Sequence, residues 1–414
     1  MRKTSFFTSL FVVASLVDSA SYAAENLSWE SCVREVQQKN ESYRSGKQSV
    51  AAANYLSKVA RGEYLPTLSG NLSYQYSDQT DSTYSAGLQI SQNLFAGLRD
   101  QGGIAQAAAR EAQEMQRFRA TRAQVSYDLK RAYEGLLYAQ NNQTLIQDII
   151  RRREDNMRLV SLRYETGREN KGSVLLSQAY FSQAKYERLQ ADFAVQVAQA
   201  QLSAVLGRPP GGDLVVFENI PESVPEVIPD YLNIVRQTPE LKIIQAQKEE
   251  AHAGVKVARS TFFPRLDVAG GFSSQDDTFF PQNDTWTATA SLTFPFFNGT
   301  KDYYSLKTAQ TLFSVASHDE RSVFLRLFPK LKQAHASFVQ SIEKLNVDLA
   351  FIEATKARSE IARSKYNNGL LSFEDWDIIE NDLISRQKSY LLSKLDRVIG
   401  QASWEQTKGE AVFP

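Results

Sequence analysis

Cysteine is almost absent from this 414-residue chain, in which Cys32 stands alone. One thiol cannot form an intramolecular disulfide, so packing has to hold the fold together even in an oxidising compartment. Only three histidines occur, and His252, His318 and His335 do not have the spacing of a metal-ligand set. Because no serine or cysteine stands in a nucleophile motif either, the sequence predicts no enzyme and no catalytic, cofactor-binding or metal site.

An excess of one charge and a long hydrophobic run are also missing. Lys plus Arg and Asp plus Glu total 47 each and are interspersed, which argues against nucleic-acid binding. After the N-terminal region nothing approaches about 18 uninterrupted apolar residues, so no transmembrane helix is predicted. Residues 1–23 combine Arg2, Lys3, a short apolar run and a small-residue exit at Ala23, which predicts a secretory signal peptide.

What the sequence does contain is one pattern used twice. Residues 58–97 read KVARGEYLPTLSGNLSYQYSDQTDSTYSAGLQISQNLFAG, and residues 256–299 read KVARSTFFPRLDVAGGFSSQDDTFFPQNDTWTATASLTFPFFNG. In each copy a helix ends at a proline, which disfavours helical geometry in the residue before it, and another helix opens after a glycine. The predicted helix–strand junctions are Pro66, Gly97, Pro264 and Gly299.

Between the junctions the apolar period changes from 3.6 to 2, which is typical of strands with one apolar and one polar face. Such strands, about 10 to 13 residues long with aromatic residues at their ends, have the size and alternation of outer-membrane strands. A soluble sheet covered on one side by helices is the alternative interpretation. The predicted strands, paired as two antiparallel hairpins, cover residues 66–77, 84–95, 264–274 and 285–297.

Long helices follow each hairpin. Apolar residues such as Val125, Ala132, Ala139 and Ile146 recur every seven positions in a proline-free stretch. A helix of roughly 60 residues would reach about 90 Å, which is far longer than a globular domain needs. Glycine-ended turns at residues 163–167 and 365–369 reverse the chain into return helices.

The register of the two copies indicates an internal duplication. Tyr164 and Tyr366 are 202 positions apart, as are the glycines of the two turns and those of the two strand exits. A helix from about Leu27, with a break near Asn40, precedes the first hairpin, and a helix over 230–261 precedes the second. The predicted division is a signal peptide 1–23, a first repeat 24–207, a Pro/Gly-rich connector 208–229, a second repeat 230–403 and a C-terminal tail 404–414.

Four strands cannot close a barrel, and open edges in lipid leave backbone groups unpaired. Membrane strands therefore require oligomerisation, and strand counting allows a dimer of eight strands or a trimer of twelve.

The repeated KVAR and P-x-L junctions, the LFAG and FFNG strand exits, the RYETG and KYNNG turns and the heptad helices together resemble the TolC family of outer-membrane efflux proteins. The resemblance implies a mainly α fold with a small β part. Four strands per chain would contribute to a trimeric, twelve-stranded transmembrane β-barrel, continued by antiparallel coiled-coil helices as a periplasmic α-barrel. It further implies a channel-tunnel in the outer membrane of a Gram-negative bacterium. The implied partners are a periplasmic adaptor and an inner-membrane transporter of a tripartite efflux or type I secretion system.

The resemblance also suggests where function resides. The family's acidic entrance position, just past the second turn, falls at Asp375, whereas its second position, three residues on, falls at Ile378. Glu374 or Asp377 can substitute, and the alternative is a solvated helix start where acids suit the positive helix end. The two turns are implied adaptor contacts, although their glycines are also needed simply to reverse the chain. Those residues are Arg163, Tyr164, Glu165, Gly167, Lys365, Tyr366, Asn367 and Gly369.

Two other functional interpretations stay open from the residues. A secreted periplasmic coiled-coil scaffold without channel activity would pair its strands in solution. A self-sufficient porin is disfavoured, because porins have short periplasmic turns in place of long helix hairpins.

Overall fold

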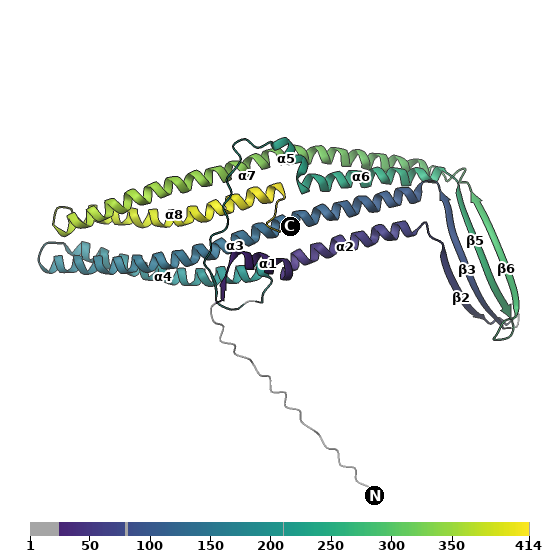
Figure 1. Cartoon of the computed structure of the whole chain (residues 1–414), viewed down its shortest axis with the longest axis horizontal. Helices are drawn as coiled ribbons and strands as arrows, with labels where there is room; N and C mark the ends of the chain where they lie inside the picture. The colour runs from purple at the N-terminus through teal and green to yellow at the C-terminus, as the bar shows by residue number, and fades with distance from the viewer. Residues whose placement is uncertain (1–24, 79–81, 210, 414) are drawn as a thin grey trace, which may run out of the picture.

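The computed structural model describes residues 25–78, 82–209 and 211–413, so the predicted signal peptide lies outside the described residues. The molecule is elongated, with four long strands at one end and two helix turns at the other (Figure 1). None of the helices in the described ranges is both long and apolar enough to cross a membrane.

The first half of the chain contains two helices, a hairpin and a long helix pair. The break predicted near Asn40 is confirmed: its side chain accepts a hydrogen bond from the Tyr43 amide at 2.9 Å and donates one to the Val205 carbonyl at 2.8 Å. A short first strand was not predicted. The elements are β1 (Glu25–Leu27), α1 (Trp29–Lys39), α2 (Glu41–Gly62), β2 (Thr67–Gln75), β3 (Thr83–Ala96), α3 (Arg99–Glu165) and α4 (Lys171–Leu206).

The second half repeats this order. Its elements are β4 (Leu214–Val216), α5 (Tyr231–Gln237), α6 (Pro239–Arg259), the 3-10 helix η1 (Ser260–Phe262), β5 (Arg265–Asp276), β6 (Asn283–Thr293), α7 (Lys301–Asn367) and α8 (Phe373–Lys408). α3 and α7 are both 67 residues long, and α4 and α8 are both 36.

Several predicted boundaries in this half were wrong. The single helix over 230–261 is broken at Thr238, whose hydroxyl accepts from the Leu241 amide and so begins α6 with Pro239 in the first turn. The connector 208–229 contains β4, which pairs in parallel with β1. β6 ends at Thr293 rather than near 297, before Pro295. α8 continues to Lys408, so the tail begins at Gly409 and not at 404.

The four long strands form one antiparallel sheet in the order β2-β3-β5-β6. The register places apolar residues opposite one another, as with Leu266 and Leu292, and Phe272 packs against Trp286 with ring centroids 4.8 Å apart. On the other face Ser73 and Ser85 hydrogen bond across strands at 2.6 Å. The predicted hairpins and their two-faced character are therefore confirmed.

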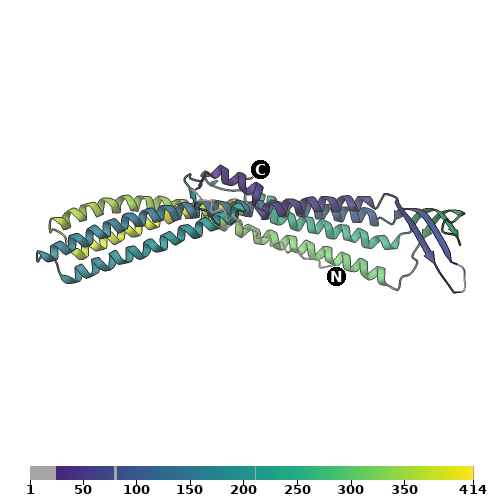
Figure 2. The same ribbon diagram turned by 90° about the horizontal axis from the view of Figure 1, so that it is seen from below.

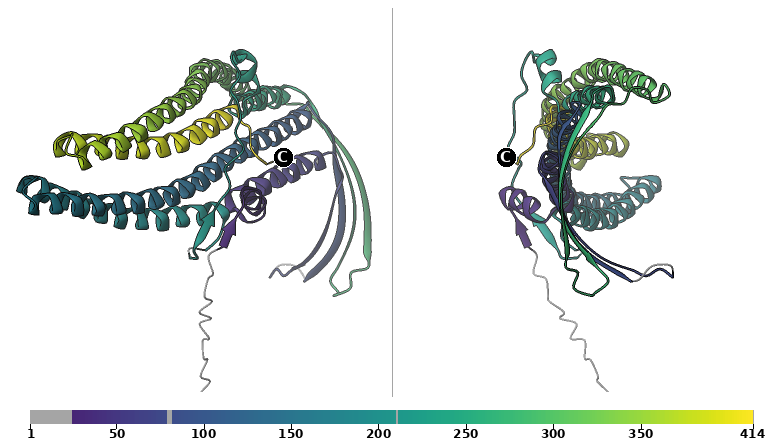
Figure 3. Two further views of the ribbon diagram at one scale, coloured as in Figure 1. Left: turned by 60° about the vertical axis from the view of Figure 1, so that its left-hand side comes forward. Right: turned by 90° about the vertical axis from the view of Figure 1, so that its right-hand side faces the viewer.

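The helices continue the strand order as a single layer. On the strand side α2 packs on α3, α3 on α6 and α6 on α7, while on the turn side α4 packs on α3, α3 on α8 and α8 on α7. The layer consequently has two free edges, one made by β2, α2 and α4 and the other by β6 and α7 (Figure 1). The connector, α5 and the C-terminal residues lie on one side of the layer (Figure 3).

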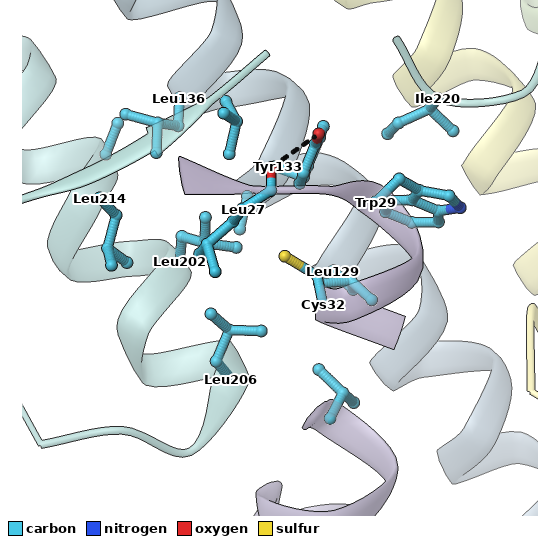
Figure 4. Packing of buried hydrophobic residues seen from close by; sticks show 14 of the residues in the cluster. Leu27, Trp29, Cys32, Leu129, Tyr133, Leu136, Leu202, Leu206, Leu214 and Ile220 are labelled. Carbon is cyan, nitrogen blue, oxygen red and sulfur yellow. Dashed lines mark hydrogen bonds between the residues drawn. The ribbon is translucent and has the colours of Figure 1, made fainter. Parts of the chain in front are cut away.

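The largest core lies at the waist, where the strand-side and turn-side helices meet (Figure 2). Leu129, Leu136 and Leu202 are fully buried there, and the Tyr133 hydroxyl donates to the Leu27 carbonyl at 3.4 Å (Figure 4). Leu331, Phe338 and Trp404 stand 202 positions later and are buried in a second waist cluster. Near the end of α3 the two predicted heptad series differ: Val160 is fully buried, whereas Tyr164 is exposed.

Gly207 ends α4 in a left-handed conformation with a φ of 76°, and a Cβ there would lie 2.3 Å from the Lys39 carbonyl oxygen. Gly167 has a similar φ of 72° with nothing within 4 Å. We expect Gly167→Ala to cost about 1–2 kcal/mol of conformational strain, and Gly207→Ala to cost more because α1 must also move. Thermal unfolding followed by circular dichroism should show the larger loss in Gly207→Ala. Equal shifts for the two variants would contradict the close approach of α4 to α1.

Candidate functional site

The two chain-reversing turns lie together at the end of the molecule opposite the strands (Figure 1). A small cluster of buried side chains fills the space between them. Its members are Val160, Ala362, Tyr366, Phe373 and Trp376. We refer to this end of the chain as the tip.

Tyr366 is the centre of the tip and is fully buried. Its ring stacks on Trp376 with centroids 4.3 Å apart and an interplanar angle of 14°. The Arg163 guanidinium lies over the other side of the ring at 4.6 Å and donates to the Tyr366 carbonyl at 2.7 Å. The Tyr366 hydroxyl donates to Glu169 at 3.0 Å, and burial together with this carboxylate raises the pKa of Tyr366. The two turns therefore hold each other.

Of the three predicted entrance carboxylates, Asp375 and Glu374 are exposed in the first turn of α8. The Ser372 hydroxyl accepts from the Asp375 amide at 3.1 Å and donates to the Asp375 carboxylate at 2.9 Å. This reciprocal cap fixes where the Asp375 side chain leaves the helix.

Asp377 differs, because its side chain points into the protein. It is paired with Arg153 of α3 at 3.4 Å and accepts a hydrogen bond from the side-chain Nδ2 of Asn381 at 2.9 Å. Burial raises the pKa of Asp377, an effect that Arg153 opposes. The suggestion that Asp377 substitutes as an exposed entrance carboxylate does not agree with this packing, since Phe373, Trp376 and Asp377 share one buried helix face.

A second ion pair joins α3 to α8 one turn further on. Arg152 contacts Glu380 at 2.5 Å, and the Ser359 hydroxyl of α7 donates to the same buried carboxylate. Sequence reasoning missed both arginines as site residues. A signal was available, because Arg153 occupies the heptad position between Ile146 and Val160, where a charge needs a buried partner.

Most of the predicted turn contacts are accessible. Arg163 is half-buried and Tyr366 is buried, so the structure commits both to the tip. The exposed turn residues are Tyr164, Glu165, Gly167, Lys365, Asn367 and Gly369.

The predicted helix–strand junctions contain two equivalent strained turns. Gly97 and Leu98 before α3 both have positive φ, as do Gly299 and Thr300 before α7. Pro66 and Pro264 each lie just before the first strand of a hairpin. Within the described residues no group of three or more His, Cys, Asp or Glu side chains is placed to hold a metal ion.

The model of the outer membrane efflux protein family matches residues 32–208 and 233–407, which is most of the chain. The chain belongs to the outer membrane efflux protein family. The predicted family and the predicted location, an outer-membrane protein that extends into the periplasm, are thereby confirmed.

Among individual members, the chain is 25% identical over 281 residues to the fusaric acid resistance protein FusA of Burkholderia cepacia. The match covers 62% of this chain and 53% of FusA, so this chain spans about half the length of that relative.

Solved channels of the same fold agree over nearly the whole chain. The outer-membrane channel CmeC of Campylobacter jejuni superposes with a TM-score of 0.81 at 14% identity, covering 92% of this chain and 85% of CmeC. VceC of Vibrio cholerae gives a TM-score of 0.79 at 17% identity, covering 92% and 96%. The predicted fold, mainly helical with a small β part, is confirmed.

The buried Arg153–Asp377 pair yields a test of how the tip is held together. Arg153→Met leaves the Asp377 carboxylate buried without its cation, and we expect α8 to open from α3 more easily by about 3 kcal/mol at pH 7.5. The folded-state pKa of Asp377 is already raised and rises further in this variant, so stability returns as pH falls through that pKa. Hydrogen exchange of residues 366–380 measures the opening.

Two variants serve as comparisons. Arg158→Met removes an exposed arginine of the same helix, 3.7 Å from Glu154, and should leave exchange unchanged. Arg153→Met/Asp377→Leu should restore much of the protection. Wild-type exchange at the tip of Arg153→Met would show that the pair does not hold α8 to α3.

Proposed function

We propose that the chain is the outer-membrane channel-tunnel of an export system, which passively conducts substrates from the periplasm or a pump to the exterior. The observation that carries this proposal is the open, two-faced layer. Its sheet is apolar on one face and polar on the other, and the layer has free edges that run through strands and helices. Such a layer suits one segment of the wall of a tube that has lipid outside and water inside.

The edges support a homotrimer. β2 and β6 each pair on one side only, and in lipid each unpaired backbone group costs several kcal/mol. Because the two edges differ, identical copies join edge to edge in a heterologous contact that closes as a ring. Three copies give twelve strands, an even number wide enough for an aqueous interior.

The helical edges carry exposed apolar side chains that a neighbouring copy would cover. On the first edge these include Tyr55 and Leu56 of α2 and Tyr186, Leu189 and Phe193 of α4; on the second they include Tyr303, Leu312, Val347 and Ile361 of α7. Both rows exceed the scattered apolar exposure of a monomeric protein and so favour an interface. At 67 residues, α3 and α7 are about 100 Å long, which is long enough to build a tunnel.

The two repeats, which run from β1 to α4 and from α5 to α8, form equivalent parts of the tunnel wall in this proposal. The partners are a periplasmic adaptor at the exposed turn residues and an inner-membrane transporter beyond it. FusA, as its name states, confers resistance to fusaric acid, and an export role for this chain is consistent with that relationship.

In the proposed trimer Asp375, with Glu374 beside it, lines the entrance. Three symmetric carboxylates in a narrow throat concentrate negative potential and attract cations. The reciprocal cap with Ser372 supports this role because it holds the Asp375 carboxylate at the helix start while Asp377 turns inward.

Single-channel recordings in planar bilayers test both the channel and the ring. We expect the wild-type protein to conduct with a preference for cations. Asp375→Ala should weaken that preference and reduce block by a trivalent cation by about tenfold, because the ring supplies the opposing charge. Asp155→Ala, which removes an exposed carboxylate of α3, is the matched control. Absence of current through the wild-type protein would contradict the proposed channel function. Asp375→Ala recordings that match the wild type would contradict the proposed ring of Asp375 carboxylates.

Photo-cross-linking to a co-expressed adaptor tests the proposed contacts. Cross-linkers at Glu165 or Asn367 should give adducts because both residues are exposed at the tip. Val224, which is 90% exposed at the connector, should give none. A co-purifying adaptor that cross-links from Val224 but from neither turn would place the contact elsewhere.

A further inference from the structure

A cavity of about 700 Å³ lies where the polar face of the sheet meets the first turn of α3. Thr67, Ser91, Asn93 and Asp267 line it from the strands, and Arg99 and Asp100 line it from α3. These four strand residues are on the polar face of the sheet, while Gln92 and Val268 of the opposite face also border the cavity. The strands and the first turn of α3 that line the cavity lie at the opposite end of the helices from the tip (Figure 1).

The cavity is rich in hydrogen-bond acceptors that lack donors. Asp100 is only 6% exposed, and although the Arg99 Nε atom lies 3.5 Å from its Oδ1 atom, that oxygen accepts no hydrogen bond from the described residues. The same holds for the Oδ1 atom of Asn93, whose amide nitrogen donates to Asp267 at 2.7 Å. Buried acceptors without donors are costly, and both of these line one cavity. A ligand with N–H donors would complement them.

The charge balance also favours a cation. Glu63, Asp100 and Asp267 place three carboxylates on the cavity lining, whereas Arg99 is the one guanidinium there. The Arg99 side chain is 44% exposed and its Nε atom is 3.5 Å from Asp100, so it neutralises this carboxylate only in part. Arg265 approaches Asp267 from outside the lining at 3.9 Å.

The size of the cavity favours an organic cation over a metal ion as its ligand. Its volume falls within the range of small-molecule sites, about 300–1,000 Å³, and the described residues contain no metal-binding group of carboxylates. Leu65, Val257 and Val268 give the lining an apolar part next to the acceptors. This combination suits a molecule with an ammonium group and an apolar body.

The second repeat shows that the buried carboxylate is not required by the helix start. Asp302 stands 202 positions after Asp100, in the equivalent first turn of α7. There the carboxylate accepts a hydrogen bond from Asn298 at 2.7 Å near the surface. Both aspartates suit the positive end of a helix, but only Asp100 lines the cavity.

We propose that this cavity binds the ammonium group of small amphiphilic organic cations, with Asp100 as the main counter-ion and Asp267 and Asn93 as further acceptors. A role for this cavity as a transient binding site for exported cations rests on the proposed channel function, whereas binding itself does not.

Binding of dansylcadaverine, a fluorescent primary ammonium probe, to the full-length protein in lipid nanodiscs tests the site. Equilibrium dialysis, corrected with empty nanodiscs, should show saturable binding to the wild-type protein. Asp100→Asn should weaken binding by about tenfold, since one charge-assisted hydrogen bond is lost. Arg99→Gln should tighten binding because a competing cation is removed, a result that misfolding cannot produce.

Asp302→Asn is the matched control and should bind as the wild type does. N-acetylated dansylcadaverine, which keeps the apolar body but lacks the charge, should not bind saturably. Equal affinity of wild type and Asp100→Asn, equal binding of the acetylated probe, or no saturable binding would each overturn the proposal. Saturable binding by a protein that carries no current would contradict the proposed channel function but support the binding site. A protein that conducts but binds no probe would support the channel function and contradict the site.

Discussion

A backbone group in hydrocarbon has no water to pair with, and in the proposed trimer this constraint decides how identical chains join. Within the sheet, hydrogen bonds between neighbouring strands pair the backbone groups. The outer sides of the two edge strands, β2 and β6, stay unpaired. The same two edges continue into α2, α4 and α7, where apolar side chains replace unpaired backbone groups as the exposed feature. One edge-to-edge contact between identical copies would therefore complete the hydrogen bonding of the sheet and cover the apolar rows of the helices.

The duplication supplies equivalent scaffolds on which the two halves have diverged. Both repeats end their return helix with a left-handed glycine that packs on the break between two earlier helices: Gly207 on α1, and Gly409 on Pro239 at the start of α6. The helix starts differ more. Asp100 is buried against the sheet, whereas its counterpart Asp302 is hydrogen bonded near the surface. At the tip, the acidic α8 start belongs to the second repeat, while the arginines that hold it come from α3 of the first.

Strong periodicity made much of the architecture predictable. Alternation over about ten residues defines strands such as β3, and heptads define α3 and α7, since both patterns report which face is buried. β1 and β4 were not predicted from the sequence. Each has only three residues and its partner lies almost a whole repeat away, so neither strand produces a local pattern. At the tip, the acids of α8 look alike in sequence. Helical spacing from Phe373 and Trp376 distinguishes buried Asp377 from exposed Asp375, but its partner Arg153 is identified only by the packing of α8 on α3. The Asp100 cavity depends on the fold as a whole, because sheet and helix meet there from distant parts of the sequence.

In the proposed assembly one chain is an incomplete segment of the tunnel wall. Class averages from electron microscopy of the detergent-purified, full-length protein test it most directly. We expect end-on views with threefold symmetry around a central opening and side views of one continuous tube, with a wide helical part that extends beyond the detergent belt. Single rods without a central opening, or closed particles of two copies, would contradict the claim.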